Sequence, residues 1–454
     1  MSANPLNLSS LLSAFGSSQP INVQEAVSQA LAADEAPEVQ WQNQQQTLQT
    51  DTSALTSIEN DVTSLESALT AMGDPAGALA SMTTSSSNSN VVTATAANGA
   101  SAANHVVVVT SLATTASWYS AEVASGTTTL ADGSFSIQVG SGTPTQITVG
   151  SGNNTLDDLA NTINGMNLGV TANVVTDASG SRLSIVSNNS GAAGNITISE
   201  DTSIAFTQAI QGQNASLTVD GIPIVSASNT VTGAVNGVTF NLVGASPGTP
   251  VDVVISPDVN SASTAISNFV SAYNTVVGDV NAQYAVGANN TEGPVAGDPT
   301  LSLLQSDLLS AGGYSTAGSA VATLADLGIT MNNDGSLTLN SATLNSAIQN
   351  NFSAVQSFLQ GTSSNGFVNF LSNQLSSLTD STNGAFTVDL QSINNEIQDL
   401  QNQINNIQPY LQQQQTYLTN EFNQADIALE ELPTEQAQLN AELGYPPSSS
   451  TTIL

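Results

Sequence analysis

Apolar residues return every seven positions near the C-terminal end of the chain, with mostly Gln, Asn, Asp and Glu between them. Residues three and four apart share one helical face, so this pattern predicts a coiled-coil helix over residues 386–443. Pro409 and Pro433 lie inside this span and each removes a backbone donor, so the sequence leaves open whether the helix is continuous. The two apolar rows are Leu390, Ile397, Ile404, Leu411, Leu418, Ala425, Leu432 and Leu439, and Ile393, Leu400, Ile407, Phe422 and Leu429.

We call each such pair of apolar rows a seam. A second seam with the same spacing lies near the N-terminal end. It predicts a helix over residues 38–72, with Pro37 in its first turn and a separate amphipathic piece over 23–31. Ordering so many residues costs more than one apolar stripe returns, so this helix needs a partner. We therefore expect the two ends of the chain to pair as a stalk. The seam residues are Trp41, Leu48, Leu55, Val62 and Leu69, with Ile58, Leu65 and Met72 in the second row.

Between the seams the apolar period changes from helical to alternating and back again. Alternation predicts a β-rich region over 84–257 with one inserted helix at 156–166. Helical spacing returns afterwards, around one short strand at 337–339. The predicted strands are 106–109, 134–139, 145–149, 170–175, 183–186, 196–198, 217–219, 238–243 and 251–255, and the later helices are 265–282, 300–309, 343–359 and 367–378.

The predicted fold class is α+β and multidomain, with a terminal coiled-coil or helical-bundle stalk that carries one or two β-rich head domains inserted between the N- and C-terminal helices. The expected divisions are a flexible or helical N-terminal segment (1–36), a stalk helix (37–83), a head (84–257), a helical stalk domain ending in the long coiled-coil helix (258–443) and a disordered tail (444–454). Within the head we expect two subdomains, 84–111 with 213–257, and 112–212.

Charge narrows the possible functions. The 454 residues include 35 acidic residues, one Arg, no Lys and one His, for a formal net charge of −34. Nucleic-acid binding and attachment to anionic membranes both need clustered basic residues, which this chain cannot supply. Without cysteine there are no disulfides. No apolar run is long enough to insert into a bilayer, and we expect no secretory signal peptide. The Lys-free polar surface is nevertheless typical of an extracellular protein, which calls for a non-standard export route.

Catalytic, metal-binding and cofactor-binding residues are not expected. His105 is the only imidazole and is interpreted as a residue at a strand edge, and Arg182 as a local ion-pair partner. The acidic residues are expected on solvated helix surfaces and turns, which argues against a carboxylate hydrolase. Gly140-Ser141-Gly142 joins two predicted strands, so it is not a phosphate-binding loop.

Several motifs in a fixed order resemble one known family over residues 21–443. They are Glu35-Ala-Pro37 with the Gln-rich seam, 157–164 (DDLANTIN), 169–175 (GVTANVV), 180–183 (GSRL), 219–222 (VDGI) with Ser228-Asn229, 237–240 (GVTF), 269–274 (FVSAYN), 327–329 (LGI), 334–337 (DGSL) and Phe422. In this order they resemble the bacterial flagellar filament-capping family, also called hook-associated protein 2. The near absence of Lys and Arg departs from the family pattern, and so does Asn22 in the N-terminal motif, where an Asp is expected.

The resemblance implies a structural protein and not an enzyme. It implies a homo-oligomer, taken as a pentamer, at the tip of the extracellular flagellum, where the cap retains exported flagellin and promotes its polymerisation. The implied partners are further copies of the chain, flagellin, the hook–filament junction proteins and an export chaperone. The implied export route is the flagellar type III channel, without a cleaved signal peptide.

Two sets of site residues follow. The stalk and subunit interface is expected at the apolar seams listed above, from Trp41 to Leu69 and from Leu390 to Leu429. Residues 1–24 carry no charge, and their apolar stripe is expected to stay unfolded until it meets the filament. The expected filament-docking residues are Leu8, Leu11, Leu12, Phe15, Leu439 and Leu443.

Two alternatives stay open at this point: a surface adhesin that acts in cell adhesion, and another axial filament or junction subunit. A separate hypothesis concerns assembly. Each copy carries a formal charge of −34 and almost no cations, so self-repulsion predicts that association depends on pH and salt.

Overall fold

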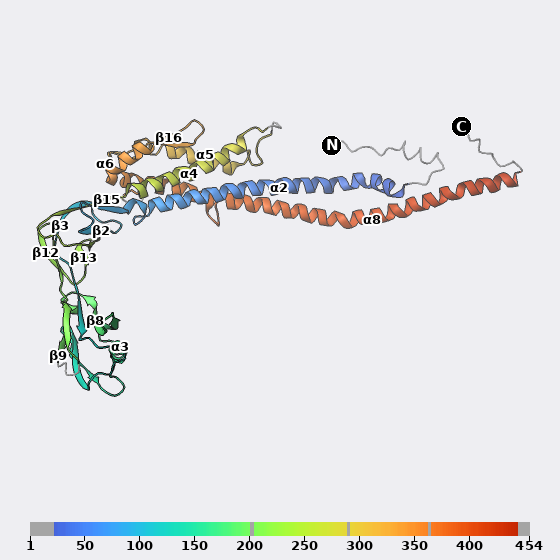
Figure 1. The fold of residues 1–454 in the computed structure, drawn as a ribbon. Coiled ribbons are helices and arrows are strands. Elements are labelled where there is room, and N and C mark those ends of the chain that lie inside the picture. The colour runs from blue at the N-terminus through green and yellow to red at the C-terminus, as the bar shows by residue number, and fades with distance from the viewer. Residues whose placement is uncertain (1–21, 200–203, 288–290, 362–364, 444–454) are drawn as a thin grey trace, which may run out of the picture.

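The structure is a computed structural model that describes residues 22–199, 204–287, 291–361 and 365–443. Figure 1 shows two long helices lying side by side, with shorter helices packed along one end and a β-rich arm turning away from that end. We call the helical part the leg and the arm the head. This arrangement confirms the predicted α+β multidomain class with a helical stalk.

The leg brings together the two ends of the chain. Helix α2 (Val23–Gly73) and helix α8 (Ala385–Glu442) run along its length. The remaining leg elements are α4 (Val259–Tyr284), α5 (Pro299–Gly312), α6 (Ser341–Leu359), α7 (Phe367–Thr379), the hairpin of β16 (Ile329–Met331) and β17 (Leu337–Leu339), and the turns η1 (Ala78–Ala80) and η3 (Leu324–Leu327). One continuous apolar core joins α2, α4, α5, α6, α7 and the start of α8.

The inner head is the part of the β arm next to the leg. One sheet has the strand order β1-β15-β3-β11-β12 and a second has β13-β14-β2. Their apolar faces share a core that includes Val107, Phe240 and Val253. The strands are β1 (Met82–Ser86), β2 (Val92–Ala96), β3 (Ala103–Ser111), β11 (Ala215–Val219), β12 (Ile222–Ser226), β13 (Thr230–Val235), β14 (Val238–Leu242) and β15 (Val251–Pro257).

The outer head is inserted between β3 and β11 and has a core of its own around Phe135 and Leu159. Its sheets have the orders β10-β4-β8-β7 and β6-β5-β9. Helix α3 (Leu156–Gly165) is capped by Thr155, whose hydroxyl accepts from the Asp158 backbone N–H at 3.2 Å. The strands are β4 (Thr115–Ser120), β5 (Gly133–Val139), β6 (Thr145–Val149), β7 (Val170–Thr176), β8 (Ser181–Ser190), β9 (Ile196–Ser199) and β10 (Phe206–Ile210), with the turn η2 (Ala192–Gly194).

The expected start of the N-terminal helix is wrong. Helix α2 begins at Val23, after the Asn22 cap, and runs through Pro37 without a break. Pro37 removes only the N–H that would bond to Ala33. The stripe that includes Val27 and Leu31 is buried, and this burial offsets the lost bond.

The prolines of the C-terminal seam also lie inside one helix. Helix α8 is continuous through Pro409 and Pro433, which settles the question that the sequence left open.

Seven strands were absent from the sequence-based prediction. Strands β1, β2 and β4 are rich in Thr, Ser and Ala. Strand β1 alternates only between half-buried and exposed positions, and β2 and β4 do not alternate regularly. Strand β12 is an edge strand whose first two residues are exposed. The expected divisions at 36/37, 83/84 and 257/258 and the exact head subdivision stay predictions.

Candidate functional site

The paired helices α2 and α8 form the predicted stalk, and they run antiparallel (Figure 1). Three side-chain hydrogen bonds fix the register. Gln44 Nε2 donates to Glu396 Oε1 at 2.9 Å, and Gln45 Nε2 donates to Gln401 Oε1 at 3.1 Å. Gln408 Nε2 donates to Glu38 Oε1 at 3.2 Å. Moving toward the N-terminus of α2 therefore means moving toward the C-terminus of α8.

The expected interface residues differ strongly in burial. On α2 the members from Leu55 to Leu69 are enclosed in the leg core, whereas on α8 the buried members lie in the middle of the helix and are flanked on both sides by half-buried ones. The buried members are Leu55, Ile58, Val62, Leu65, Leu69, Leu400, Ile404 and Leu411, and the half-buried members are Trp41, Leu48, Leu390, Ile393, Ile397, Ile407, Leu418, Phe422 and Leu429. The half-buried members gain full burial only if something further covers them.

Helix α8 extends beyond the N-terminal end of α2 (Figure 1). Continuing this register places Val23, the first residue of α2, opposite about residue 420 of α8. Beyond that point the seam continues with Leu432 (54% exposed) and Leu439 (57% exposed), and Leu443 follows at 63%. We call residues 422–443 the free end of α8. Of the expected docking residues, Leu439 and Leu443 lie there in the open, and Leu8, Leu11, Leu12 and Phe15 lie outside the described residues.

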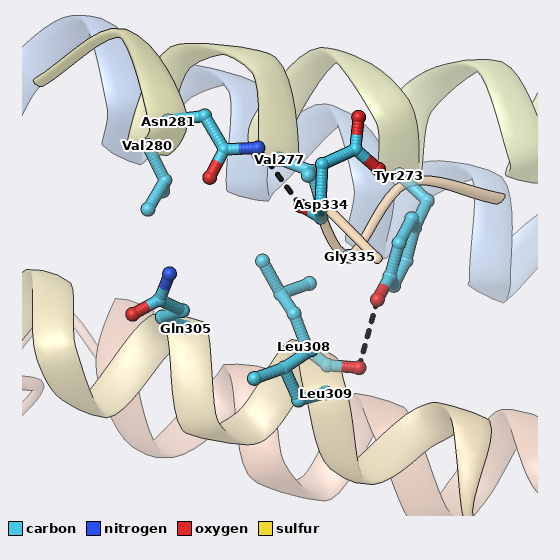
Figure 2. Close-up of a pocket in the computed structure, with 9 residues that line it drawn as sticks. All are labelled: Tyr273, Val277, Val280, Asn281, Gln305, Leu308, Leu309, Asp334 and Gly335. Carbon is cyan, nitrogen blue, oxygen red and sulfur yellow. Dashed lines mark hydrogen bonds between the residues drawn. The ribbon is translucent and has the colours of Figure 1, made fainter. Parts of the chain in front are cut away.

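The leg also holds a small cavity between α4, α5 and the β16–β17 turn. Figure 2 shows Tyr273, Asn281, Gln305 and Asp334 around it, with the Tyr273 hydroxyl donating to the Leu308 carbonyl at 2.8 Å. Burial raises the pKa of the Tyr273 phenol, so it stays protonated and serves as a donor. The cavity holds about 20 Å³, room for one water rather than a substrate, since ligand pockets are far larger.

Sequence reasoning missed a set of acidic side chains at helix contacts in the leg. The pKa of Asp61 on α2 is raised to about 6, first by a hydrogen bond with Asp279 of α4 and then by burial. Burial raises the pKa of Asp389 on α8 and of Glu66 on α2. The expectation that acids lie on solvated faces and turns is therefore wrong for these residues. Asp61 stands beside Val62 of the seam, which is the only signal in the sequence.

The two basic side chains of the head are both engaged. Arg182 Nη2 donates to Glu122 Oε2 at 2.6 Å, and its guanidinium lies 5.7 Å from the centre of the Tyr119 ring, which confirms the local ion pair. His105 lies within β3, and its Nδ1 is 2.7 Å from Asp220 Oδ2. The hydrogen bonds from His105 and from the Val106 N–H lower the pKa of the Asp220 carboxyl.

No metal or membrane feature stands out in the part of the chain that the structure describes. Among residues 22–199, 204–287, 291–361 and 365–443, no three His, Asp or Glu side chains cluster in a way that could hold a metal ion. Within the same ranges, none of the helices combines the length and the apolarity that crossing a membrane requires. What these residues do present is a paired-helix leg with an exposed end, and a two-part β head.

Comparison with known families gives three matches along the chain. The family described as Flagellar hook-associated protein 2 N-terminus matches residues 19–116, and Flagellar hook-associated protein 2 C-terminus matches 212–434. The Flagellin hook IN motif matches 134–189, inside the outer head. The N- and C-terminal regions of one family therefore account for both helical ends and the inner head.

Individual relatives agree with these matches. The B-type flagellar hook-associated protein 2 of Pseudomonas aeruginosa is 28% identical over 442 residues, which cover 89% of this chain and 92% of that protein. The flagellar hook-associated protein 2 of Escherichia coli K12 is 26% identical and covers 77% of this chain and 80% of its own length.

A solved structure also shares the fold. The D1-D2-D3 domains of the flagellar cap protein FliD from Escherichia coli align with a TM-score of 0.58 and 26% identity, over 75% of this chain and 99% of that one. Motif order, domain order and fold agree, and the chain is a member of the flagellar hook-associated protein 2 family.

Proposed function

We propose that this protein caps the distal end of the bacterial flagellar filament, where it retains exported flagellin and promotes its polymerisation. Family membership supports the cap role, since a solved relative is named a flagellar cap protein. The observation that carries the proposal is the free end of α8, where the seam that is buried against α2 continues without a partner helix among the described residues. A leg of this kind supplies an insertion surface, and the head at its other end supplies a lid (Figure 1).

The oligomer and the partners belong to the same proposal. Copies of the chain assemble side by side, taken as a pentamer, through the half-buried part of the α2–α8 seam. The free end of α8, with Leu439 and Leu443, meets flagellin at the filament tip or the junction proteins before flagellin is added. Export through the flagellar type III channel, with a chaperone, brings the chain to the outside. The role is mechanical and needs no catalysis.

Deletion of the coding sequence in the native organism tests the function. Without the cap, we expect motility to fail and monomeric flagellin to accumulate in the medium, and full-length protein supplied in trans should restore both. Loss of the protein with no release of flagellin would instead favour a filament or junction subunit. Motile cells that lose only surface attachment would favour an adhesin.

A paired-variant experiment tests the free end of α8. Leu432→Glu with Leu439→Glu places two charges on the exposed seam. Thr434→Glu with Ala441→Glu adds the same two charges to the opposite face of the same helix, where both residues are also exposed. We expect only the first pair to release flagellin into the medium. Equal release by both pairs would mean that charge alone, and not the apolar seam, causes the defect.

Mass measurement of the purified assembly tests the subunit number. A pentamer would have five times the chain mass of 46.0 kDa. Any other closed ring would leave the cap role intact and correct the number alone.

A further inference from the structure

Paired carboxyl groups lie where the leg helices meet. Asp61 on α2 and Asp279 on α4 share a hydrogen bond, although the two helices approach each other with apolar side chains on both sides of it. Two carboxylates repel each other and neither can donate, so this bond requires a proton on one of them. Packing of α2 against α4 and binding of a proton are therefore linked at this contact.

A second carboxyl group of this kind joins α8 to the start of α5. Asp389 of α8 is hydrogen-bonded to Asp298, the residue that caps α5. Thr300 is hydrogen-bonded to both acids. Its hydroxyl donates to Asp389 Oδ2 at 3.1 Å, and its backbone N–H donates to Asp298 Oδ1 at 2.7 Å. Burial raises the pKa of Asp51 on α2, and the nearby Asp298 raises it further; the Oδ1 of Asp51 is buried without a hydrogen-bond partner among the described residues.

No cation balances these acids. The only Arg and the only His of the chain lie at positions 182 and 105 in the head, and the chain contains no Lys. The other titratable side chains on the packed leg helices are again acids or tyrosines, and α7 contributes none. Besides the acids named above, they are Glu25, Asp34, Glu35, Glu38, Glu59 and Glu66 on α2, Tyr273 and Tyr284 on α4, Asp307 on α5, and Glu396, Asp399, Tyr410, Tyr417, Glu421, Asp426, Glu430, Glu431, Glu435 and Glu442 on α8.

We propose that the leg is a proton-responsive bundle, in which the Asp61–Asp279 and Asp298–Asp389 contacts take up protons as the helices pack and release them as the packing loosens. Acid surroundings then tighten the leg, and neutral surroundings relax it.

The sign follows from linkage. The pKa of Asp61 rises from 3.8 in the unfolded chain to about 6 in the folded leg, so the folded state binds more protons between these values. Stability from this group is full below about pH 3.8 and is lost as the pH rises through about 6. The shift would allow a change of about a hundredfold in the unfolding equilibrium, and solvent screening of this half-exposed pair reduces our expectation to about tenfold.

The experiment uses the full chain in a Trp118→Phe background. The two tryptophans are Trp41 in the leg and Trp118 in the head, so the remaining fluorescence reports the leg. Unfolding by denaturant is measured at about pH 4.5 and about pH 7, on either side of the folded pKa. We expect the unfolding equilibrium constant of the parent to be about tenfold larger at the higher pH.

Substitution separates this contact from general acidity. Asp61→Asn keeps the shape and the hydrogen bond to Asp279 without needing a proton, so the pH dependence should flatten. Asp399→Asn removes one charge from the exposed surface of α8 and should leave the pH dependence unchanged. The same pH slope in the parent and in Asp61→Asn, or a parent that is more stable at neutral pH, would overturn the proposal.

A titration of the parent protein keeps the test independent of any variant. Carboxyl carbon NMR of the Asp61 side chain should show a midpoint near about 6 in the folded protein. A midpoint at the ordinary aspartate value would overturn the proposal even if Asp61→Asn failed to fold. Neither result depends on the cap function, because both are measured on purified protein without flagellin.

Discussion

Acids on the sides of the leg helices and acids at turns and strand ends of the head have pKa values shifted in opposite directions. Of the 35 acidic residues, nine lie in 84–257 and the other 26 lie outside it, whereas the single Arg and the single His both lie inside. In the leg helices, burial and neighbouring acids raise the pKa of Asp51, Asp61 and Asp389. In the head, hydrogen bonds lower the pKa of Asp177 and Asp220.

The difference teaches where a protein without lysine can place its charge. A turn or a strand end offers backbone N–H groups that stabilise a carboxylate, and such bonds lower the pKa of Asp177 and Asp220 in the head. A helix side offers none, because its N–H groups are already bonded within the helix. A carboxyl group at a helix contact therefore needs a proton instead of a cation. We expect the leg and the head to respond to substitution as separate units.

The largest expected effect comes from the leg core. Leu65 of α2 is fully buried, and Leu65→Ala should destabilise the leg by about 2–5 kcal/mol through the lost burial and the cavity left behind. Thermal unfolding followed by Trp41 fluorescence, in the Trp118→Phe background, should show the lower midpoint. Ser64→Ala, at the exposed neighbouring position, is the control. A matching drop in the head, read from Trp118 in a Trp41→Phe background, would contradict the separation.

The next effect uses one hydrogen-bonding device that occurs in both regions. Asn274 of α4 holds both backbone groups of Leu337, with its Oδ1 accepting from the N–H at 2.6 Å and its Nδ2 donating to the carbonyl at 2.8 Å. Asn229 holds Ala113 in the same way in the inner head, at 2.7 and 3.0 Å. Each Asn→Ala change leaves two partly buried backbone groups unpaired, at a cost of about 1–3 kcal/mol.

The two variants should differ at the leg reporter. Asn274→Ala should lower the midpoint read from Trp41, whereas Asn229→Ala should leave it unchanged, because Asn229 and Ala113 lie in the inner head and not in the leg core. Hydrogen exchange at the Leu337 and Ala113 amides would locate each opening directly. If both variants lowered the Trp41 midpoint equally, the leg and the inner head would have to be one cooperative unit.

Salt should affect the leg more than the head. Raising the ionic strength from about 0.01 M to about 0.15 M shortens the Debye length from about 30 Å to about 8 Å, which screens repulsion among the leg acids. We expect the Trp41 midpoint to rise and the Trp118 midpoint to stay nearly constant. Light scattering in the same series should show stronger association of copies at higher salt and lower pH. If association depended on neither salt nor pH, repulsion between the acidic copies would not control assembly.

The smallest effect comes from the sole arginine. Arg182→Met breaks the ion pair with Glu122 in a half-exposed position, where such pairs contribute about 0.2–1 kcal/mol. Denaturant unfolding read from Trp118 should detect this, with Glu122→Gln as the reciprocal variant. A loss of several kcal/mol would show that the guanidinium supports the outer head in some further way.

Long helices were predictable from the sequence because their apolar period persists over many turns. Residues such as Leu390 and Leu411 mark α8 clearly, and Leu55 and Leu69 mark α2. The helix continued past Pro37 because one lost hydrogen bond is a local cost, whereas the burial of Leu31 is decided by packing. Sequence rules about proline consider only the local cost.

The strands and the carboxyl contacts were harder to predict, for two physical reasons. Strands such as β1 present Thr and Ser to neighbouring strands, so their burial depends on the sheet rather than on their own alternation. The contact between Asp61 and Asp279 joins residues 218 positions apart, and no periodicity connects them. The free end of α8 could be predicted only in part. The seam predicts that α8 pairs with another helix, but only the α2–α8 register shows where that pairing ends.

The single arginine has a practical consequence. Trypsin cleaves only after Arg or Lys, so this chain offers the protease one peptide bond, and that bond lies in β8, an interior strand between β4 and β7. Cutting there requires the outer head to open, since a paired strand does not fit a protease cleft. The amount of the two tryptic fragments on a gel therefore measures how often the outer head opens. Opening of the leg or of the inner head does not produce these fragments.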